Sequence, residues 1–466
     1  MRMPAAPVTI FARASGAGKA GVAVFRISGP AAFSVAERLC GPLPAPNRAA
    51  LRSIRDFTGD LIDKGLVLPF RGPASFTGED VVELHLHGGA AIEGALFDAL
   101  SAFGARPAEA GEFARRALLN GKLDLAEIEG LADLLEAETK LQRMQALGQF
   151  EGRLSKLAAG WRKRLLAIMT PLEADIDFPD ESDVPAAIAA RAAPEIDALI
   201  EELEKSRAAS KGAMALREGL KIAIIGAPNA GKSSLLNRLA GSDRAIVSAT
   251  PGTTRDVIEV RLDLGGIAAS LFDTAGLREN SADPIEIEGI RRTRMTAEKA
   301  DIRILMIDVS RETFQPGSVP RGTFGLDTQP EVVENAKYGL LREGDFVILN
   351  KIDLILGQDV PVGLGERTFG MSVRTGEGCE TFLAALTDAA RNICLSEDVP
   401  LTRARHTAAV TDAVAHLRAA RTRLAGQAEL AAEDVRLASR ALGRITGDVN
   451  VEDVLDAIFS SFCIGK

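Results

Sequence analysis

The stretch Gly226-Ala-Pro-Asn-Ala-Gly-Lys-Ser233 decides the fold of the central part of this 466-residue chain. It follows an apolar run, residues 221–225, that is typical of a buried strand, and it precedes Ser234-Leu-Leu-Asn-Arg-Leu239, which reads as a helix. A strand, a glycine-rich turn and a helix in this order predict a P-loop, in which backbone N–H groups and the positive end of the helix surround phosphates. Lys232 would reach the β- and γ-phosphates, and Ser233 would offer a hydroxyl to Mg²⁺.

Three further motifs follow in order, namely Gly252-Thr-Thr-Arg-Asp256, Asp273-Thr-Ala-Gly276 and Asn350-Lys-Ile-Asp353. A P-loop alone indicates only phosphate binding, whereas the ordered series indicates a guanine-nucleotide switch. The carboxylate of Asp353 can accept from both the ring N–H and the exocyclic amine of guanine. Adenine offers no such pair, so the site would select GTP over ATP. Ser372-Val-Arg374 fits the last loop that contacts the base.

The first two of these motifs would form loops that respond to the state of the nucleotide. A hydroxyl of Thr253 or Thr254 would close on Mg²⁺ and the γ-phosphate, and Asp273 would hold the Mg²⁺ shell from the end of a strand. We therefore predict that Ser233 and Thr254 hold Mg²⁺, and that Lys232 and Asp273 take part in hydrolysis. The residues predicted to contact the nucleotide and its metal ions are Asn229, Ala230, Gly231, Lys232, Ser233, Ser234, Ser248, Ala249, Thr250, Pro251, Gly252, Thr253, Thr254, Asp273, Thr274, Ala275, Gly276, Asn350, Lys351, Asp353, Ser372, Val373 and Arg374.

The position just after Asp-Thr-Ala-Gly, where a glutamine often orients the attacking water, is Leu277. An apolar side chain cannot polarise water, so hydrolysis needs another acid. Glu279, Glu286 and Glu288 follow in the same loop, and an ordinary solvated charge is the alternative interpretation of each.

Composition limits the class of protein. The formal charge of −9, with 46% hydrophobic and 26% charged residues, fits a soluble globular protein and argues against a non-specific nucleic-acid or DNA binder. The four cysteines lack pair or metal spacing, which suits a reducing compartment. The chain shows no secretory signal and no apolar run of about 20 residues, so we expect a cytoplasmic protein away from membranes.

Periodicity divides the chain into four segments. Residues 1–120 mix short strands with helices and predict an α+β domain, and residues 217–385 predict an α/β P-loop GTPase domain of the Ras-like kind. The flanking residues 121–216 and 386–466 carry apolar stripes at helical spacing. The simplest interpretation is a multidomain protein in which the GTPase domain is inserted into an α-helical domain whose two halves pack together.

Four regions resemble the MnmE (TrmE) family of bacterial tRNA-modification GTPases, and the resemblance covers nearly the whole chain. They are Gly21-Val-Ala-Val-Phe-Arg-Ile-Ser-Gly29, Phe76-Thr-Gly-Glu-Asp-Val-Val-Glu-Leu84 with His87-Gly-Gly89, Asn120-Gly-Lys-Leu-Asp-Leu125, and Cys463-Ile-Gly-Lys466. A Cys-x-Gly-Lys motif behind an inserted GTPase domain is highly specific, and most other P-loop GTPases lack such an N-terminal domain.

The resemblance implies a reaction. Proteins of this family form homodimers through a folate-binding-like N-terminal domain and act with the FAD-containing MnmG (GidA) in a heterotetramer. Together they add a carboxymethylaminomethyl or aminomethyl group at C5 of the wobble uridine (U34) of certain tRNAs. The one-carbon unit comes from 5-formyl- or 5,10-methylene-tetrahydrofolate. Carried over by motif, the folate contacts are Arg26, Glu83, Lys122 and Lys466. Cys463 is a candidate nucleophile or redox group, with simple packing as the alternative.

The resemblance also implies activation by K⁺, which would neutralise transition-state charge where other GTPases use an arginine. The K⁺ ligands carried over are Asn229, the carbonyls of Ser248 and Thr250, and Thr253. Glu286 carries over as the acid that organises the water, although Glu288 leaves this assignment open by two positions.

Two rival functions remain. One is a ribosome-assembly or translation GTPase that acts as an RNA-binding switch without modification chemistry. The other is a folate-dependent aminomethyl- or methyltransferase. Weaker signals are the strand pair His85 and His87, for which a structural role outweighs a metal site, and basic clusters that are candidate tRNA patches but more often solvated helix faces. These clusters are Arg162-Lys-Arg164, Arg291-Arg-Thr-Arg294, and Arg418 with Arg421 and Arg423.

Overall fold

The structure is a computed structural model, and it describes residues 8–177, 188–246, 259–273, 298–310, 342, 344–355, 367–395, 400–448 and 465. The chain divides into two compact units. Unit 1 comprises Met1–Ala132, Gly148–Ile200 and Ala409–Lys466, and unit 2 comprises Asp133–Leu147 and Glu201–Ala408. The four segments expected from the sequence are a finer division, and their boundaries stay predictions.

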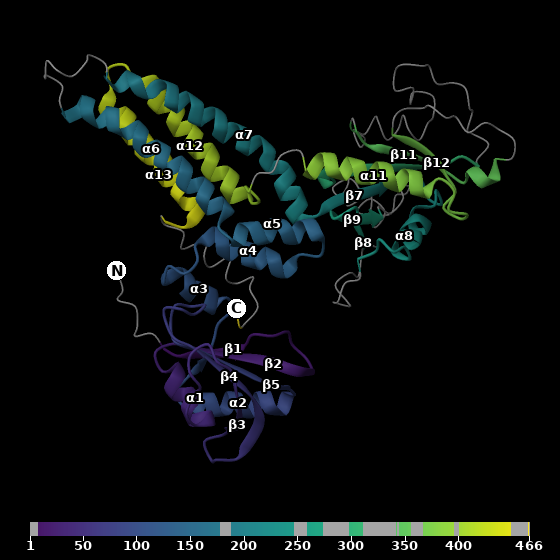
Figure 1. The fold of residues 1–466 in the computed structure, drawn as a ribbon. Helices are drawn as coiled ribbons and strands as arrows, with labels where there is room; N and C mark the ends of the chain where they lie inside the picture. Colours follow the sequence, from purple (N-terminus) through teal and green to yellow (C-terminus); the bar gives the residue numbers. More distant parts are fainter. Residues whose placement is uncertain are drawn as a thin grey trace, which may run out of the picture. The chain divides into compact units, whose positions relative to one another are not determined.

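The N-terminal part of unit 1 is a six-stranded sheet with the order β3-β4-β5-β2-β1-β6, antiparallel except for the β1–β6 pair. Its strands are β1 (Ile10–Arg13), β2 (Ala20–Ser28), β3 (Ala50–Arg55), β4 (Leu61–Phe70), β5 (Val81–Gly88) and β6 (Arg106–Pro107). Helices α1 (Ala32–Cys40) and α2 (Ala90–Ala102) cover one face, where they share a core with the sheet (Figure 1).

Alternation along β2 decides which side chains face that core. Ala23, Phe25 and Ile27 are buried under the two helices, so Arg26 points to the opposite face. The β2–β5 register sets Arg26 directly across from Glu83. Two residues that are 57 positions apart in the sequence therefore meet on the face that α1 and α2 leave open.

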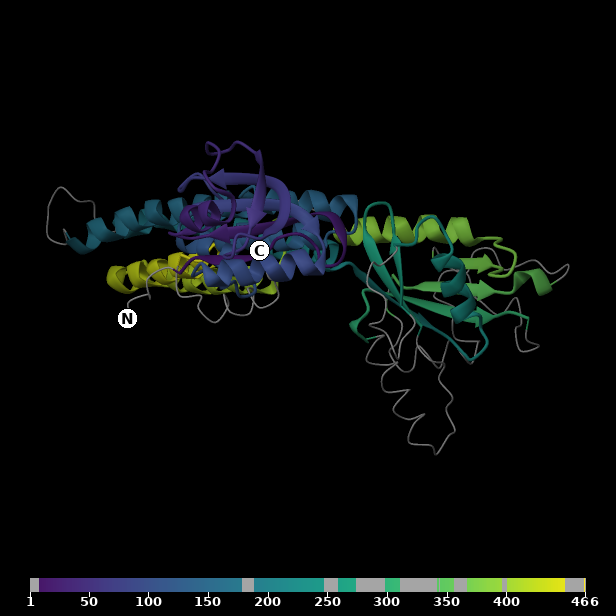
Figure 2. The same ribbon diagram turned by 90° about the horizontal axis from the view of Figure 1, so that it is seen from below.

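Helices make up the rest of unit 1 and continue into unit 2. They are α3 (Glu112–Leu119), α4 (Leu125–Glu136), α5 (Lys140–Phe150), α6 (Arg153–Asp177), α7 (Ala193–Glu218), α12 (Ala404–Arg423) and α13 (Ala428–Thr446), with a short 3₁₀ turn, η1 (Ile188–Ala192). Asp124 and Glu127 begin α4 with reciprocal hydrogen bonds, each side chain accepting from the other's backbone N–H. Figures 1 and 2 show α6 and α13 side by side, and Trp161 and Leu165 of α6 are fully buried.

Unit 2 contains a second six-stranded sheet with the order β12-β11-β10-β7-β9-β8, in which only β8 runs antiparallel. Its strands are β7 (Leu220–Ile225), β8 (Glu259–Asp263), β9 (Ala268–Asp273), β10 (Ile302–Asp308), β11 (Phe346–Asn350) and β12 (Thr368–Met371). The order reverses at β7, and parallel α/β sheets bind ligands at the carboxyl ends of strands beside such a reversal.

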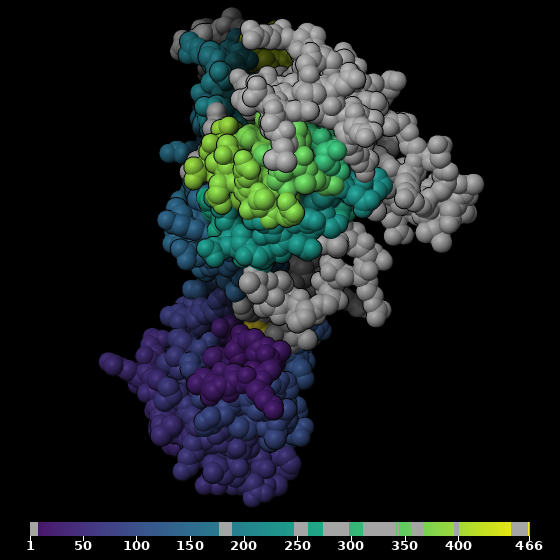
Figure 3. Space-filling model, turned by 90° about the vertical axis from the view of Figure 1, so that its right-hand side faces the viewer, coloured from purple at the N-terminus to yellow at the C-terminus, as the bar shows by residue number. Residues whose placement is uncertain are grey.

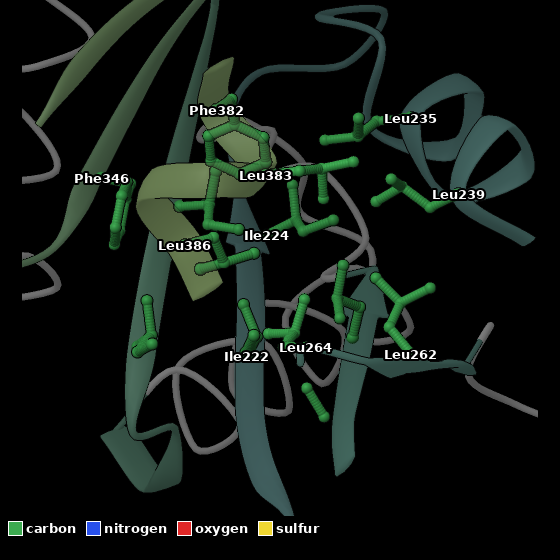
Figure 4. Packing of buried hydrophobic residues seen from close by; sticks show 14 of the residues in the cluster. Ile222, Ile224, Leu235, Leu239, Leu262, Leu264, Phe346, Phe382, Leu383 and Leu386 are labelled. Atoms are coloured by element: carbon green, nitrogen blue, oxygen red, sulfur yellow. The ribbon is translucent and has the colours of Figure 1, made fainter. Parts of the chain in front are cut away.

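Both faces of this sheet are buried, as its apolar strands require. Ile222 and Ile224 of β7 face α8 (Lys232–Ala240) and α11 (Cys379–Cys394) in one core, which Figure 4 shows from close by. Ala223 and Ile225 point into a second cluster on the other face. Residues of α11 and β12, in green, form part of the surface in Figure 3. No described helix is long and apolar enough to cross a membrane.

Candidate functional site

The turn between β7 and α8 has backbone angles that its sequence makes possible. Gly226 has a φ of 151°, and a Cβ there would lie 2.3 Å from the carbonyl oxygen of Met306. Gly231 has a φ of 106° and begins α8, and its Cβ would lie 2.2 Å from Nδ2 of Asn350. Asn229, at a φ of 67°, takes the left-handed conformation that asparagine tolerates. The turn can therefore close tightly in front of the N-terminus of α8.

Lys232 places its ammonium group inside this turn. Its Nζ donates to the carbonyl oxygens of Gly226 (2.9 Å) and Ala227 (3.1 Å), and the residue is buried. An ammonium held by carbonyls next to a helix N-terminus is a ready binding group for phosphate.

Ser233 and Asp273 meet where α8 begins and β9 ends. The Ser233 hydroxyl donates to Oδ2 of Asp273 at 2.6 Å. Oδ1 of Asp273 is buried, and it has no hydrogen-bond partner among the described residues. A hydroxyl beside a carboxylate oxygen without a partner fits a hard divalent cation such as Mg²⁺, which prefers oxygen ligands. The structure thus brings together two of the residues predicted around Mg²⁺.

Asn350 connects the P-loop to the loop that follows β12. The asparagine is buried at the end of β11, where its Nδ2 donates to the carbonyl oxygen of Ala230 (2.7 Å) and its Oδ1 accepts from the backbone N–H of Val373 (3.1 Å). One amide side chain thereby satisfies two backbone groups from segments about 140 residues apart. Its role here is to hold the loops of the site together.

Asp353 and Arg374 form an ion pair at the same edge, with Arg374 Nη2 donating to Asp353 Oδ2 at 2.8 Å. The hydroxyl of Ser372 and the guanidinium of Arg374 hold the pKa of Asp353 below its ordinary value. The carboxylate is therefore ionised at neutral pH, which is the form that accepts hydrogen bonds from guanine.

Asp308 supports this site through Lys351, and it was not among the residues predicted from the sequence. It ends β10, and its Oδ2 accepts from Nζ of Lys351 at 2.6 Å while Oδ1 accepts from the Ser310 hydroxyl at 2.6 Å. Burial alone would raise the pKa of Asp308, but these hydrogen bonds lower it below its ordinary value. A carboxylate at the end of a parallel strand was the available signal.

A cavity of about 640 Å³ lies between these groups. Its lining includes predicted contacts from the P-loop, the Asn350 motif and the loop after β12, and it also includes Leu354, which was not predicted. The lining residues are Asn229, Gly231, Lys232, Ser233, Ser234, Asn350, Lys351, Asp353, Leu354, Ser372, Val373 and Arg374. The lining thus includes both the phosphate-binding turn at Lys232 and the Asp353–Arg374 pair.

Several predicted residues lie outside the described part of the chain, and their roles stay predictions. They are Ser248, Ala249, Thr250, Pro251, Gly252, Thr253, Thr254, Thr274, Ala275, Gly276, Glu286, Cys463 and Lys466. The same holds for Glu279, Glu288 and the cluster at 291–294.

Arg26 and Glu83 lie on the face of the first sheet opposite α1 and α2, where their side chains are 18% and 17% exposed. Arg26 donates through Nη2 and Nε to Oε1 of Glu83, at 2.8 and 3.1 Å, and its guanidinium lies 5.1 Å from the ring of Phe76 and 5.6 Å from that of Phe113. The side chain of Lys122 lies against Gly78, where an added Cβ would come within 3.1 Å of its Cγ. These contacts place the charge pair beside the half-buried ring of Phe76 and the fully buried ring of Phe113.

Gly465 is the one residue of the C-terminal Cys-Ile-Gly-Lys motif that the structure describes. Gly465 is buried, with a φ of 108°, and a Cβ there would lie 2.0 Å from the carbonyl oxygen of Arg13. The end of the chain therefore packs against the end of β1, where Arg13 also pairs with Glu93 at 2.8 Å.

The weaker signals have structural explanations. Nδ1 of His87 lies 2.9 Å from Asp63, and within the described residues no group of three or more His, Cys, Asp or Glu could hold a metal ion. Most arginines of the described basic clusters are paired with acids, which reduces their positive potential. The pairs are Arg162–Asp448, Arg164–Glu195, Arg421–Asp197 and Arg423–Asp434.

Comparison with known proteins gives a consistent result. The family model for the GTP-binding protein TrmE N-terminus matches residues 9–122, and that for the MnmE helical domain matches residues 125–463. The chain is 48% identical over 463 residues to the tRNA modification GTPase MnmE of Granulibacter bethesdensis, covering 98% of this chain and 99% of that protein. It is 49% identical over 464 residues to the MnmE of Parvibaculum lavamentivorans, covering 98% of this chain and all of that protein.

Among solved structures, Era of Aquifex aeolicus bound to GDP and AlF₄⁻ is 24% identical, covers 36% of this chain and 56% of its own, and has a TM-score of 0.28, which is too low to support an argument. The family models and the full-length relatives carry the assignment. The two family models and the full-length relatives together cover the N-terminal part, the helical part and the P-loop part of the chain. The chain belongs to the MnmE family of tRNA modification GTPases.

Proposed function

We propose that this GTP hydrolase uses its nucleotide cycle to modify the wobble uridine of certain tRNAs at C5. The observation that carries the proposal is the convergence of Lys232, Asn350 and Asp353 around one cavity, in a chain related over its full length to tRNA modification GTPases. Asp273 joins this site through its hydrogen bond with Ser233 of the lining. In the proposed reaction a carboxymethylaminomethyl or aminomethyl group is added at U34.

The described residues support the following roles in hydrolysis. Lys232 binds the β- and γ-phosphates by exchanging its carbonyl partners for phosphate oxygens. Asp353, ionised and oriented by Ser372 and Arg374, accepts the guanine N–H groups. Ser233 and Asp273 would hold Mg²⁺, which supplies neutralisation of the phosphate charge when it is bound.

Two further parts of the proposal extend to residues that the structure does not describe. Asn229 lines the cavity and offers an amide oxygen, which suits K⁺, and Ser248, Thr250 and Thr253 would complete that site. Thr254 would reach Mg²⁺ and Glu286 would orient the attacking water. We propose that the two segments that carry these residues close on the nucleotide with GTP and release it after hydrolysis.

We propose that the N-terminal sheet binds a tetrahydrofolate that donates the one-carbon unit. The Arg26–Glu83 pair beside the half-buried ring of Phe76 supports this role, because a planar pterin can stack on an aromatic ring and hydrogen-bond to a carboxylate. Lys122 and Lys466 would contact the folate tail, and Cys463 is the candidate reactive group. We further propose a homodimer that acts with the FAD-containing MnmG on tRNA in the cytoplasm.

The first experiment is nucleoside mass spectrometry of total tRNA from cells that lack this protein. The strain is complemented with wild type, with Asp273→Ala and with Asp388→Ala, an exposed aspartate of α11 that serves as the matched control. We expect loss of C5-modified wobble uridine, restored by wild type and Asp388→Ala but not by Asp273→Ala.

Other outcomes would separate the parts of the proposal. Unchanged wobble uridines in the deletion strain would refute the modification and favour a ribosome-assembly GTPase, which ribosome profiles would test. Restoration by Asp273→Ala would refute the dependence of modification on the nucleotide site. For the folate site, binding of 5-formyltetrahydrofolate should fall in both Arg26→Ala and Glu83→Gln, and retention in both would refute that assignment.

A further inference from the structure

Arg238 lies in the last turn of α8, six residues after the phosphate-binding Lys232. Its Nε donates to the carbonyl oxygen of Val373 at 2.6 Å, and its Nη2 donates to the carbonyl oxygen of Arg374 at 2.9 Å. One guanidinium thus holds two consecutive carbonyls of the loop that follows β12. Hydrogen bonds from an ionised donor are the stronger kind, and the planar fork of arginine fixes their geometry.

Arg238 and Asn350 hold the loop after β12 by different backbone groups of Val373. Gly376 N–H donates to the Ser372 carbonyl (2.8 Å), which closes the turn on itself. Outside the turn, Asn350 accepts from the N–H of Val373. Arg238 holds the carbonyl of the same residue, so Val373 is fixed at both ends of its backbone.

The loop is also shaped to admit the guanidinium. Gly376 has a φ of 96°, and a Cβ at this position would lie 2.7 Å from Nη1 of Arg238. A side chain here would collide with the arginine as well as strain the backbone. Glycine at this position therefore leaves the space that the guanidinium occupies.

We propose that Arg238 is a positioning residue for guanine recognition, connecting the helix that binds phosphate to the loop that contacts the base. This role of Arg238 rests on the proposed function, in which the cavity binds guanine nucleotide. Arg238 acts through the backbone of Arg374, whose side chain pairs with Asp353 at 2.8 Å. When the two carbonyls are released, the loop and the partner of Asp353 lose their fixed position, and the base is held less tightly.

The test measures nucleotide dissociation from the full-length protein with a fluorescent GDP analogue. The variants are Arg238→Ala, Arg238→Lys and, as a matched control, Arg244→Ala. Among the described residues, the guanidinium of Arg244 forms one ion pair, at 3.5 Å with the exposed Glu380. We expect dissociation about tenfold faster in Arg238→Ala, because a charged hydrogen bond contributes an energy of the order that changes a rate tenfold. Arg238→Lys should be intermediate, since one ammonium lacks the fork, and Arg244→Ala should match wild type.

A second readout distinguishes positioning of the base from general weakening of the protein. IDP lacks the exocyclic amine that distinguishes guanine, so the ratio of GDP to IDP affinity reports how well Asp353 is placed. We expect this ratio to fall in Arg238→Ala, while the far-UV circular dichroism spectrum stays that of wild type. Equal loss of affinity for GDP and IDP, or dissociation as slow as in Arg244→Ala, would overturn the inference. Wild-type protein that binds no GDP would instead overturn the proposed function, and the inference with it.

Discussion

Replacement of Asn350 by alanine tests whether one buried amide holds the nucleotide site together. The side chain is 2% exposed, and it bonds the carbonyl of Ala230 at 2.7 Å and the N–H of Val373 at 3.1 Å. Alanine removes both partners and supplies none. The carbonyl of Ala230 and the N–H of Val373 then lose the hydrogen bonds that Asn350 made to them.

The expected loss of stability follows from this count. Leaving one buried polar group without a partner costs about 1–3 kcal/mol, so two groups cost about 2–6 kcal/mol. Water can enter from the adjacent cavity and satisfy part of the loss, so we expect about 3 kcal/mol for Asn350→Ala. With a urea dependence of about 2 kcal/mol per molar, the unfolding midpoint of unit 2 should fall by about 1.5 M.

Cysteines and the single tryptophan let the two units be measured separately. Cys379 and Cys394 are buried in the core of unit 2, so their alkylation in increasing urea, read by mass spectrometry, reports the opening of that core. Trp161 is the only tryptophan and lies in α6 of unit 1, so its fluorescence reports unit 1. This separation matters because a chain of several domains has no single free energy of unfolding.

The control is Asn237→Ala, which removes the side chain of an exposed asparagine of α8 and should change the free energy of unfolding of unit 2 by at most about 0.5 kcal/mol. The Trp161 transition should be unchanged in both variants. If Asn350→Ala moved the thiol-labelling midpoint no further than Asn237→Ala and GDP binding were retained, the reasoning about this amide would be refuted.

Three further predictions concern unit 2. Gly226→Ala should abolish GDP binding and destabilise unit 2 by roughly 3 kcal/mol, because the new Cβ would collide with the Met306 carbonyl oxygen and alanine would be strained at this positive φ. A calorimetric titration that gives wild-type affinity for GDP would contradict this. Burial alone would raise the pKa of Asp308, but its hydrogen bonds with Lys351 and Ser310 hold that pKa below its ordinary value in the folded protein. The stability from these contacts is therefore present above the unfolded pKa of about 4 and is lost as the pH falls through the folded pKa. The urea midpoints of wild type and Asp308→Asn should therefore differ at about pH 6 and approach each other only as the pH falls below about 4, and a constant difference would argue against it. Burial raises the pKa of Cys394 to about 12, so at about pH 8 iodoacetamide should label it roughly a thousandfold more slowly in the native protein than in urea, and equal rates would show that the core is open.

The nucleotide site could be predicted largely from the sequence because its chemistry depends on short local segments. The strand, glycine turn and helix around Gly226 and Lys232 fix their own backbone, so the pattern alone indicated where phosphate would be held. The motif Asn350-Lys-Ile-Asp353 also lies at the end of a strand, so its position could be predicted from the local sequence in the same way. The sequence also placed Asp273 at the end of a strand, where it meets Ser233.

Tertiary structure decided which distant side chains complete that site. Asp308 and Arg238 belong to no motif, and their partners lie 43 and about 135 residues away. The order of the parallel strands puts β10 beside β11, and packing of α8 puts Arg238 against the loop after β12. Local sequence contains no record of such neighbours, because strand order is set by crossover connections and not by the residues within a strand.

The N-terminal site shows the same division. The family resemblance carried by the sequence motifs named Arg26 and Glu83 as functional candidates, and alternation along each strand fixed which residues share a face. Only the β2–β5 register brought the two side chains together as a pair, with Phe76 and Phe113 beside them. A shift of one residue in that register would have turned every side chain of the strand to the other face, so the pairing depends on burial of Phe25 and Ile27 beneath α1 and α2.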